Sequence, residues 1–208
     1  ETVHISSDYN HIDCRFPIQT VIRPQTHEHR DFRGFAGRID GGVFKPGDKV
    51  KSLPSGFVST IKTIELNGAP IEEAFAPMAV TMTLADEIDN SRGDMIVREN
   101  NVPEVGQDLN VLVTWMSTKP LQANTKVVIK HTTNECMAMV KELKYKIDIN
   151  SLHRIEGIET VAMNEIAKIS IRTSKPIFYD VYKKNRLTGS IIIIDAQTND
   201  TIGAGMIV

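Results

Sequence analysis

Short alternations of apolar and polar residues, typical of β-strands with one buried face, run through most of the chain. The stretch from Arg15 to Arg23 alternates around Phe16, Ile18 and Val21. Similar stretches follow at residues 59–66, 80–84, 109–115, 126–131, 137–149 and 166–172.

Turn signals made of Gly, Pro, Asn and Asp lie between these stretches, at residues 41–42, 46–48, 54–56, 67–68 and 92–94. Helical periodicity is nearly absent, and residues 68–75 and 158–164 are expected to hold a turn of helix at most. Many short strands with regular Gly and Pro punctuation predict an all-β fold of the sandwich or barrel type.

The end of the chain predicts a β-hairpin that closes a barrel. Two apolar runs, Ile191–Ile194 and Thr201–Met206, are joined by a short polar turn at residues 197–200. The run of consecutive isoleucines predicts a strand buried on both faces. Gly203 and Gly205 stand two residues apart, so they share a face and leave room there for a bulky neighbour.

A polar break at residues 98–104 divides the chain into halves of about 100 residues each, a common size for a small domain. There is no clear internal repeat between the halves. We therefore predict two consecutive β-barrel domains, at residues 13–102 and 103–208.

Composition narrows the class of protein. The chain has 208 residues, 41% of them hydrophobic, which is enough for real cores, and its net charge of −2 does not favour nucleic acid or an anionic membrane as partner. No apolar stretch approaches the roughly 20 residues of a membrane span, and no secretory signal is seen. Only Cys14 and Cys136 occur, far apart, which indicates a reducing cytoplasm.

Candidate chemistry is sparse. His27, Glu28, His29 and Asp31 carry groups that can bind zinc, but they crowd onto one loop, and a solvated polar loop is the favoured interpretation. Arg92-Gly93-Asp94 is interpreted as a turn rather than an adhesion motif. The basic residues Lys141, Lys144, Lys146, Lys183 and Lys184 are interpreted as a solvated face rather than a phosphate site. No catalytic, cofactor-binding or metal-binding residue is therefore predicted.

Several phrases carry a resemblance to a known family. The residues from Asn185 to Met206 fit N-x-x-T-G-x-x-x-x-I-D-x-x-[ST]-N-x-T-x-G-A-G-M, and Gly37–Val50 fits G-R-[IV]-x-x-G-x-[ILVF]-x-x-G-[DE]-x-[VIL]. With the phrases at 15–19, 31–37, 53–56, 86–94, 114–116 and 147–150, the chain resembles the large-subunit family of bacterial sulfate adenylyltransferase (CysN/NodQ) over its whole length. One departure from the family pattern is the stretch of residues 26–30, which is longer and richer in histidine.

The resemblance implies two barrels like domains 2 and 3 of elongation factor Tu. In that family a preceding domain binds GTP and Mg²⁺ and hydrolyses GTP, which drives the small catalytic subunit to make adenosine 5′-phosphosulfate from ATP and sulfate. This chain contains no G-x-x-x-x-G-K-[ST] and no N-K-x-D, and the match of Asp31–Gly34 to D-x-x-G is taken as coincidence. We expect a fragment that binds no cofactor, with residues 1–12 a remnant of the linker from the GTPase domain.

The implied partners are the small catalytic subunit and the GTPase domain of the same protein, with no nucleic acid and no membrane. Asn185, Arg186 and Thr188 are the candidate partner-binding residues, because they precede a buried strand without an obvious core role; local capping of the hairpin is the alternative. Two other functions stay open, namely a translation-factor fragment that holds aminoacyl-tRNA and a free-standing scaffold module.

Overall fold

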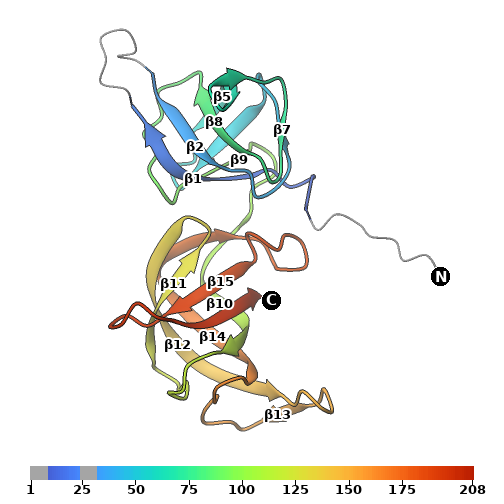
Figure 1. Ribbon diagram of the computed structural model, residues 1–208, viewed down its shortest axis with the longest axis vertical. Coiled ribbons are helices and arrows are strands. Elements are labelled where there is room, and N and C mark those ends of the chain that lie inside the picture. Colours follow the sequence, from blue (N-terminus) through green and yellow to red (C-terminus); the bar gives the residue numbers. More distant parts are fainter. Residues whose placement is uncertain (1–8, 24–31) are drawn as a thin grey trace, which may run out of the picture. The chain divides into compact units, whose positions relative to one another are not determined.

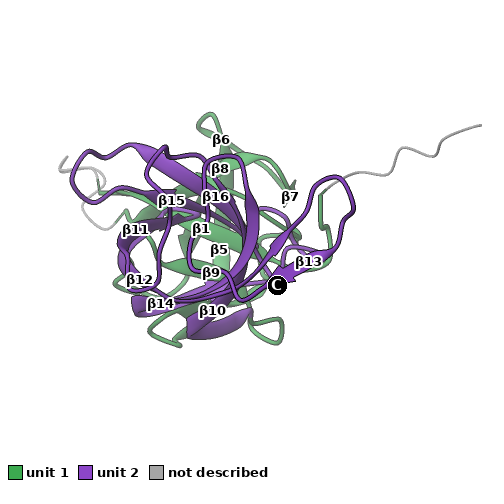
Figure 2. Cartoon of the chain, turned by 90° about the horizontal axis from the view of Figure 1, so that it is seen from below, with its two compact units in different colours: residues 1–102 green, residues 103–208 purple. Residues whose placement is uncertain are grey.

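The computed structural model describes residues 9–23 and 32–208 and divides the chain into two compact units, Glu1–Val102 and Pro103–Val208 (Figures 1 and 2). Strands and turns make up the described residues, with no helix among them. Neither of the two stretches for which a turn of helix was the upper limit forms one. Residues 68–75 contain the short strands β6 (Ala69–Pro70) and β7 (Ala74–Phe75), and Val161 forms a bridge with Leu121.

The first unit is a closed barrel whose strands follow the order β4-β9-β1-β2-β8-β5 and close by pairing of β5 with β4. The strand β6 extends the sheet beside β5, and β3 pairs with β7 outside it. Alternate side chains fill the interior because an antiparallel strand in a barrel turns every second residue inward. The bounds of the other strands are β1 Arg15–Ile22, β2 Gly34–Arg38, β3 Val43–Phe44, β4 Lys49–Leu53, β5 Val58–Leu66, β8 Ala79–Leu84 and β9 Met95–Arg98.

The second unit is also a closed barrel, in the order β11-β15-β16-β10-β14-β12, closed by pairing of β12 with β11. A short strand, β13 (Arg154–Glu156), pairs with β12 outside the ring. Leu109, Val111 and Val113 are buried and pair with Ile171, Ile169 and Ala167 across β10 and β14, which builds the centre of the core. The strands are β10 Glu104–Trp115, β11 Lys126–His131, β12 Asn134–Ile147, β14 Ile166–Tyr179, β15 Ser190–Ile194 and β16 Thr201–Ile207.

The predicted closing hairpin is confirmed as β15 and β16. Its turn is shaped by Asp195, whose carboxylate accepts the amide hydrogens of Gln197 (2.7 Å) and Thr198 (3.1 Å). These hydrogen bonds favour the ionised carboxylate and hold the pKa of Asp195 below its ordinary value. The turn therefore depends on the ionised form of this side chain.

The prediction that the isoleucine strand is buried on both faces is wrong. Ile191 and Ile193 point into the core, whereas Ile192 is 41% exposed. In a closed antiparallel barrel only one face of each strand points into the interior. Burial therefore alternates along the strand although its residues are all isoleucine. Gly203 and Gly205 share a face as predicted, and that face is the buried one. A Cβ at Gly205 would lie 2.4 Å from Cγ1 of Val111.

Candidate functional site

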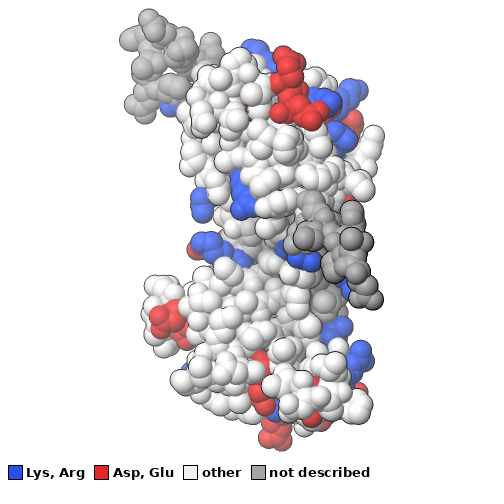
Figure 3. Space-filling model, turned by 45° about the vertical axis from the view of Figure 1, so that its right-hand side comes forward, with Lys and Arg blue, Asp and Glu red and all other residues white. Residues whose placement is uncertain are grey.

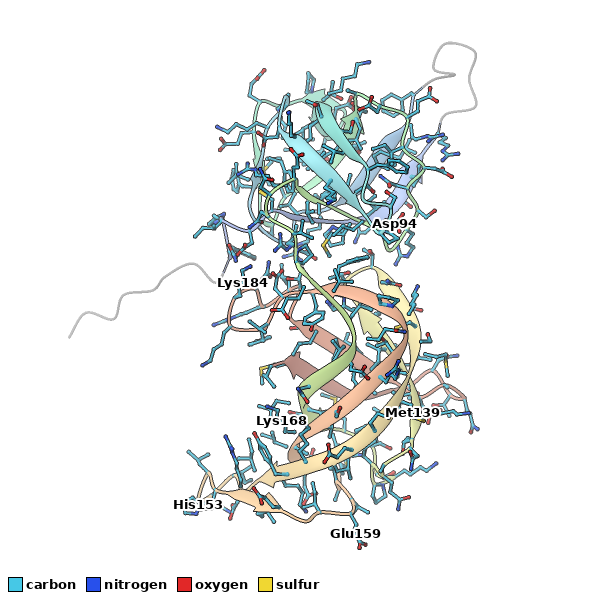
Figure 4. All side chains as sticks on the ribbon, turned by 180° about the vertical axis from the view of Figure 1, so that it is seen from behind. Asp94, Met139, His153, Glu159, Lys168 and Lys184 are labelled. Atoms are coloured by element: carbon cyan, nitrogen blue, oxygen red, sulfur yellow. The ribbon has the colours of Figure 1, made fainter. Side chains whose placement is uncertain are left out.

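The candidate partner-binding residues lie in the connection between β14 and β15, residues 180–189, which we call the 180–189 loop (Figure 1). Lys184 marks this loop, at the end of the second unit opposite the tip that carries His153 (Figure 4). The loop is anchored on the last strand, because the amide of Tyr182 donates to the carbonyl of Ile207 (2.9 Å) and the amide of Ile207 to that of Gly189 (2.8 Å). These hydrogen bonds give the loop a defined shape.

Glycine is required where the loop folds back on itself. A Cβ at Gly189 would lie 2.4 Å from Cα of Tyr182 and 2.7 Å from the carbonyl oxygen of Asn185, closer than non-bonded atoms can approach. The amide of Gly189 also donates to that carbonyl oxygen (2.9 Å). The Thr-Gly pair in the sequence therefore marks a place where two stretches of backbone touch.

Asn185 shapes the loop from inside. Its side chain is 3% exposed, and Oδ1 accepts the amide hydrogens of Leu187 (2.9 Å) and Thr188 (3.3 Å). An asparagine that accepts backbone amides two and three residues ahead makes an Asx turn, which fixes the local backbone. This geometry is the local capping that the sequence left open for this residue.

Thr188 is fully buried and joins a polar group that the sequence did not predict. Its hydroxyl donates to Oδ2 of Asp180 (2.8 Å), and Nζ of Lys184 lies 3.4 Å from Oδ1 of the same carboxylate. Asp180 is 2% exposed, so its charge is compensated inside the loop. The two ends of the loop are held together by this carboxylate.

The loop is also tied to the opposite strand by a buried histidine. His131, at the end of β11, is 2% exposed, and its Nε2 lies 2.7 Å from the carbonyl oxygen of Thr188. A carbonyl oxygen only accepts, so Nε2 carries the hydrogen. Burial lowers the pKa of His131, against the opposing effects of the Thr188 carbonyl and the Asp180 charge. The neutral imidazole is thus the form that the fold holds.

Sequence reasoning did not single out His131, although a signal was present. The inward positions of its strand read Val127, Ile129 and then His131, so a polar residue takes the place of a third apolar one. A polar side chain at such a position needs a buried hydrogen-bond partner. The partner is 57 residues away along the chain.

Arg186 is the member of the predicted set that lies at the surface. Asn185 and Thr188 form the interior of the loop, whereas Arg186 and its neighbour Lys183 are exposed. The carbonyl of Arg186 accepts a hydrogen bond from the hydroxyl of Ser190 (2.5 Å), which fixes the backbone that carries the guanidinium. The loop can therefore present basic groups from a rigid base, whereas its hydroxyl–carboxylate pair, Thr188 and Asp180, is buried.

The other candidates from the sequence have structural roles or cannot be placed. Arg92-Gly93-Asp94 forms a turn in which Arg92 donates to the carbonyl of Gln19 (2.9 Å) and Asp94 accepts the amide of Ser91 (2.8 Å). Lys146 pairs with Glu165 at 2.7 Å. The predicted loop of His27, Glu28, His29 and Asp31 lies outside the described residues. Across residues 9–23 and 32–208, no group of three metal-ligating side chains is placed to hold an ion.

Comparison with known proteins gives both a profile match and long alignments. The family profile described as "GTP-eEF1A C-terminal domain-like" matches residues 108–208. The chain is 43% identical to sulfate adenylyltransferase subunit 1 of Bacteroides fragilis, over 100% of this chain and 43% of that protein. It is 44% identical to the bifunctional enzyme CysN/CysC of Mycobacterium tuberculosis, over 100% of this chain and 34% of that protein. The chain thus spans less than half the length of these relatives.

Solved structures show the same fold at low identity. The structure of sup35 complexed with GMPPNP superposes with a TM-score of 0.84 at 13% identity, over 100% of this chain and 49% of that one. The complex of sup35 with GDP gives a TM-score of 0.82 at 14% identity, over 94% of this chain and 47% of that one. These likenesses show the fold alone.

Proposed function

The chain is homologous over its whole length to the C-terminal, barrel-forming part of sulfate adenylyltransferase subunit 1, and we propose that it is the docking and regulatory part of such a subunit. In this role it binds the small catalytic subunit and the GTPase domain of its own protein. It relays the state of the bound GTP, so that hydrolysis supports synthesis of adenosine 5′-phosphosulfate from ATP and sulfate. We propose that the subunit has this role in the cytoplasm.

The observation that carries this proposal is the 43% identity to a subunit 1 sequence over an alignment that covers the whole chain. A shared fold requires far less, as the 13% identity to sup35 at a TM-score of 0.84 demonstrates. An identity of 43% is well above the level that a shared fold alone requires. It therefore favours a shared role over a shared scaffold only.

We propose the 180–189 loop as the contact with the catalytic subunit, with Asn185 and Thr188 shaping it and Arg186 making the contact. The support is its geometry, since a loop fixed by buried hydrogen bonds loses little conformational entropy when a partner binds. Arginine is also frequent among the residues that dominate binding energy at interfaces. We therefore expect the exposed guanidinium of Arg186 to contribute to the binding free energy.

The direct test is titration of the purified chain into the small catalytic subunit of a close relative. We expect binding, and we expect Arg186→Ala to weaken the affinity about tenfold, the size of effect typical of an interface arginine. Arg172→Ala serves as the matched control, because Arg172 is an exposed arginine on the barrel wall whose ion pair with Asp108 is solvent-accessible. The absence of binding would remove the docking role. Equal losses for both variants would move the contact away from the loop.

The rival function, binding of aminoacyl-tRNA, has only the shared fold to support it. Affinity for RNA depends on basic groups that neutralise phosphates, and the chain has a net charge of −2. On the face drawn in Figure 3, acidic and basic side chains of the described residues are scattered among wide uncharged areas. Filter binding with tRNA at low salt separates the two functions, since retention of tRNA at submicromolar concentrations of the protein would favour the rival.

A further inference from the structure

The chain enters and leaves the first barrel through one group of polar side chains, which we call the clasp and which consists of Asn10, Asp13, Arg15 and Asn101. Asp13 and Arg15 are buried, and the two asparagines are half-buried. Asn10 and Asp13 precede β1, and Arg15 is its first residue. Asn101 lies beyond β9, two residues before the second unit begins at Pro103. The strands β1 and β9 are antiparallel neighbours, with Arg15 opposite Val97, so their ends meet (Figure 1).

The guanidinium of Arg15 is the centre of the clasp. The side chain is fully buried, and Nη1 donates to the carbonyl oxygen of Asn101 (2.6 Å), to Oδ1 of Asn101 (2.9 Å) and to the carbonyl oxygen of Cys14 (2.9 Å). Nη2 lies 3.8 Å from Oδ1 of Asp13, which supplies the opposite charge. A buried arginine held in this way becomes costly as soon as one of its partners moves.

Asn101 is held from both sides by the incoming chain. Its Nδ2 donates to Oδ1 of Asp13 (2.8 Å), and its Oδ1 accepts the amide hydrogen of Cys14 (3.0 Å). Asp13 is in turn positioned by Asn10, whose Nδ2 donates to Oδ2 of Asp13 (2.7 Å). Oδ1 of Asn10 accepts the amides of Ile12 (2.8 Å) and Asp13 (2.9 Å). A continuous path of hydrogen bonds thus runs from Asn10 to Asn101.

From this path we infer that the clasp is a mechanical relay, which couples the position of the incoming chain at Asn10–Asp13 to the connection that leads into the second unit. A displacement of Asn10 cannot leave Asp13 in place, because three hydrogen bonds join them directly or through the turn. A displaced Asp13 removes a partner from both Asn101 and the buried Arg15. The connection then loses its anchor, and its backbone is released.

That the relay carries the state of a preceding domain to the connection into the second unit rests on the proposed function. The coupling itself is a property of this chain and requires no partner. Coupling between two sites is reciprocal, so a perturbation at either end has to appear at the other. That requirement gives the test.

Site-resolved amide hydrogen exchange on the intact chain provides the measurement. Asn10→Ala is expected to speed exchange at the backbone amide of residue 101, which donates to the carbonyl of Arg98, about tenfold. Asn101→Ala is expected to speed exchange at the amide of Asp13 by a similar factor, although the direct acceptor of that amide, Asn10, remains. The amide of Met82, in β8, reports that the barrel is otherwise intact.

Asn110→Ala is the matched control, an exposed asparagine on β10 that is expected to change neither amide. Effects in both directions support the relay, whereas an effect in one direction or in neither overturns it. Should an alanine variant fail to fold, Asn10→Ser and Asn101→Ser carry the same test with a smaller change. A positive exchange result with no binding of the catalytic subunit would sink the proposed function and leave the relay standing.

Discussion

At the scale of single residues, buried polar groups decide the shape of the candidate site. Thr188 and Asn185 have polar side chains, yet both are buried because each satisfies backbone or carboxylate groups of the 180–189 loop. A buried acceptor that loses its donor costs more than the hydrogen bond itself contributes. Small changes at these positions should therefore have measurable effects on stability.

Thr188→Val keeps the shape of the side chain and removes the hydroxyl that donates to Asp180. We expect the second unit to lose about 1–3 kcal/mol of unfolding free energy, because the buried carboxylate keeps its charge and loses a donor. Urea denaturation followed by fluorescence reports this unit alone, since the single tryptophan of the chain, Trp115, is buried in its core. Thr201→Val, at an exposed threonine of β16, should stay within about 0.5 kcal/mol. An equal loss in both variants would contradict the expectation.

A second residue-scale prediction concerns pH. Burial raises the pKa of Asp40 from 3.8 to about 6, with Arg38 opposing the shift. A carboxyl whose pKa is higher in the folded state gains protons on folding, so its contribution to stability increases as pH falls from about 6 towards 3.8. Asp40→Asn should therefore stabilise the first unit by about 1–2 kcal/mol at pH 7. The gain should shrink as the pH approaches 4.

Thermal unfolding at pH 7 and pH 4.5, followed by circular dichroism, provides the measurement for Asp40→Asn. Asp86→Asn offers a comparison, because Oδ2 of Asp86 accepts a hydrogen bond from the hydroxyl of Ser59 (2.8 Å). The idea fails if Asp40→Asn gives no gain at pH 7 or gives a gain that is independent of pH.

At the scale of elements, close approach of strands limits which residues the barrel accepts. The strands β10 and β16 pair with Val113 opposite Gly205, and the methyl groups of Val111 occupy the space beside that glycine. The glycine and the valine are thus fitted to one another across the pair. Overfilling such a place forces strain on both strands.

Gly205→Ala is expected to destabilise the second unit by about 1–3 kcal/mol, because its Cβ would lie 2.4 Å from Cγ1 of Val111. Gly106→Ala is the control, since a Cβ there meets only the ring of Tyr179 at 3.6 Å, an ordinary contact. Tryptophan fluorescence in urea again reports the difference. A double variant with Val111→Ala should recover part of the loss, and no recovery would point to a cause other than this contact.

Elements that depend on local pattern could be predicted from the sequence, and those that depend on remote contacts could not. Alternation located the inner positions of β10 and β11, and the Gly-rich ending located the hairpin of β15 and β16. The exposure of Ile192 escaped prediction, because a run of isoleucines does not reveal that its sheet closes into a ring. The link of Thr188 to His131, 57 residues away, is set by the pairing of β11 with β15, and its link to Asp180, 8 residues away, is set by the folding of the 180–189 loop.

At the scale of the whole molecule, the described residues form two closed barrels. The sequence holds no G-x-x-x-x-G-K-[ST], which cradles phosphates in GTPases of this class. In the proposed role, the state of the bound GTP reaches the barrels through the GTPase domain of the same protein.

Isothermal titration of the chain with GTP and Mg²⁺ is expected to give no binding heat. Phosphates are held chiefly by backbone amides of a glycine-rich loop at a helix N-terminus, and the described residues form no helix. Micromolar binding that GDP competes with would overturn this expectation, and ATP serves as the control for unspecific binding of nucleotides.

The isoleucine strand has a consequence for aggregation of the protein when the second barrel is not folded. A run of isoleucines without Pro or charge is the kind of segment that stacks into intermolecular β-structure when its edges are free. In the barrel, β15 has β11 on one side and β16 on the other, so neither edge is available to another molecule. Protection against aggregation therefore lasts only as long as the second barrel stays closed, and conditions that open it, rather than high concentration alone, should set the limit for storing the protein.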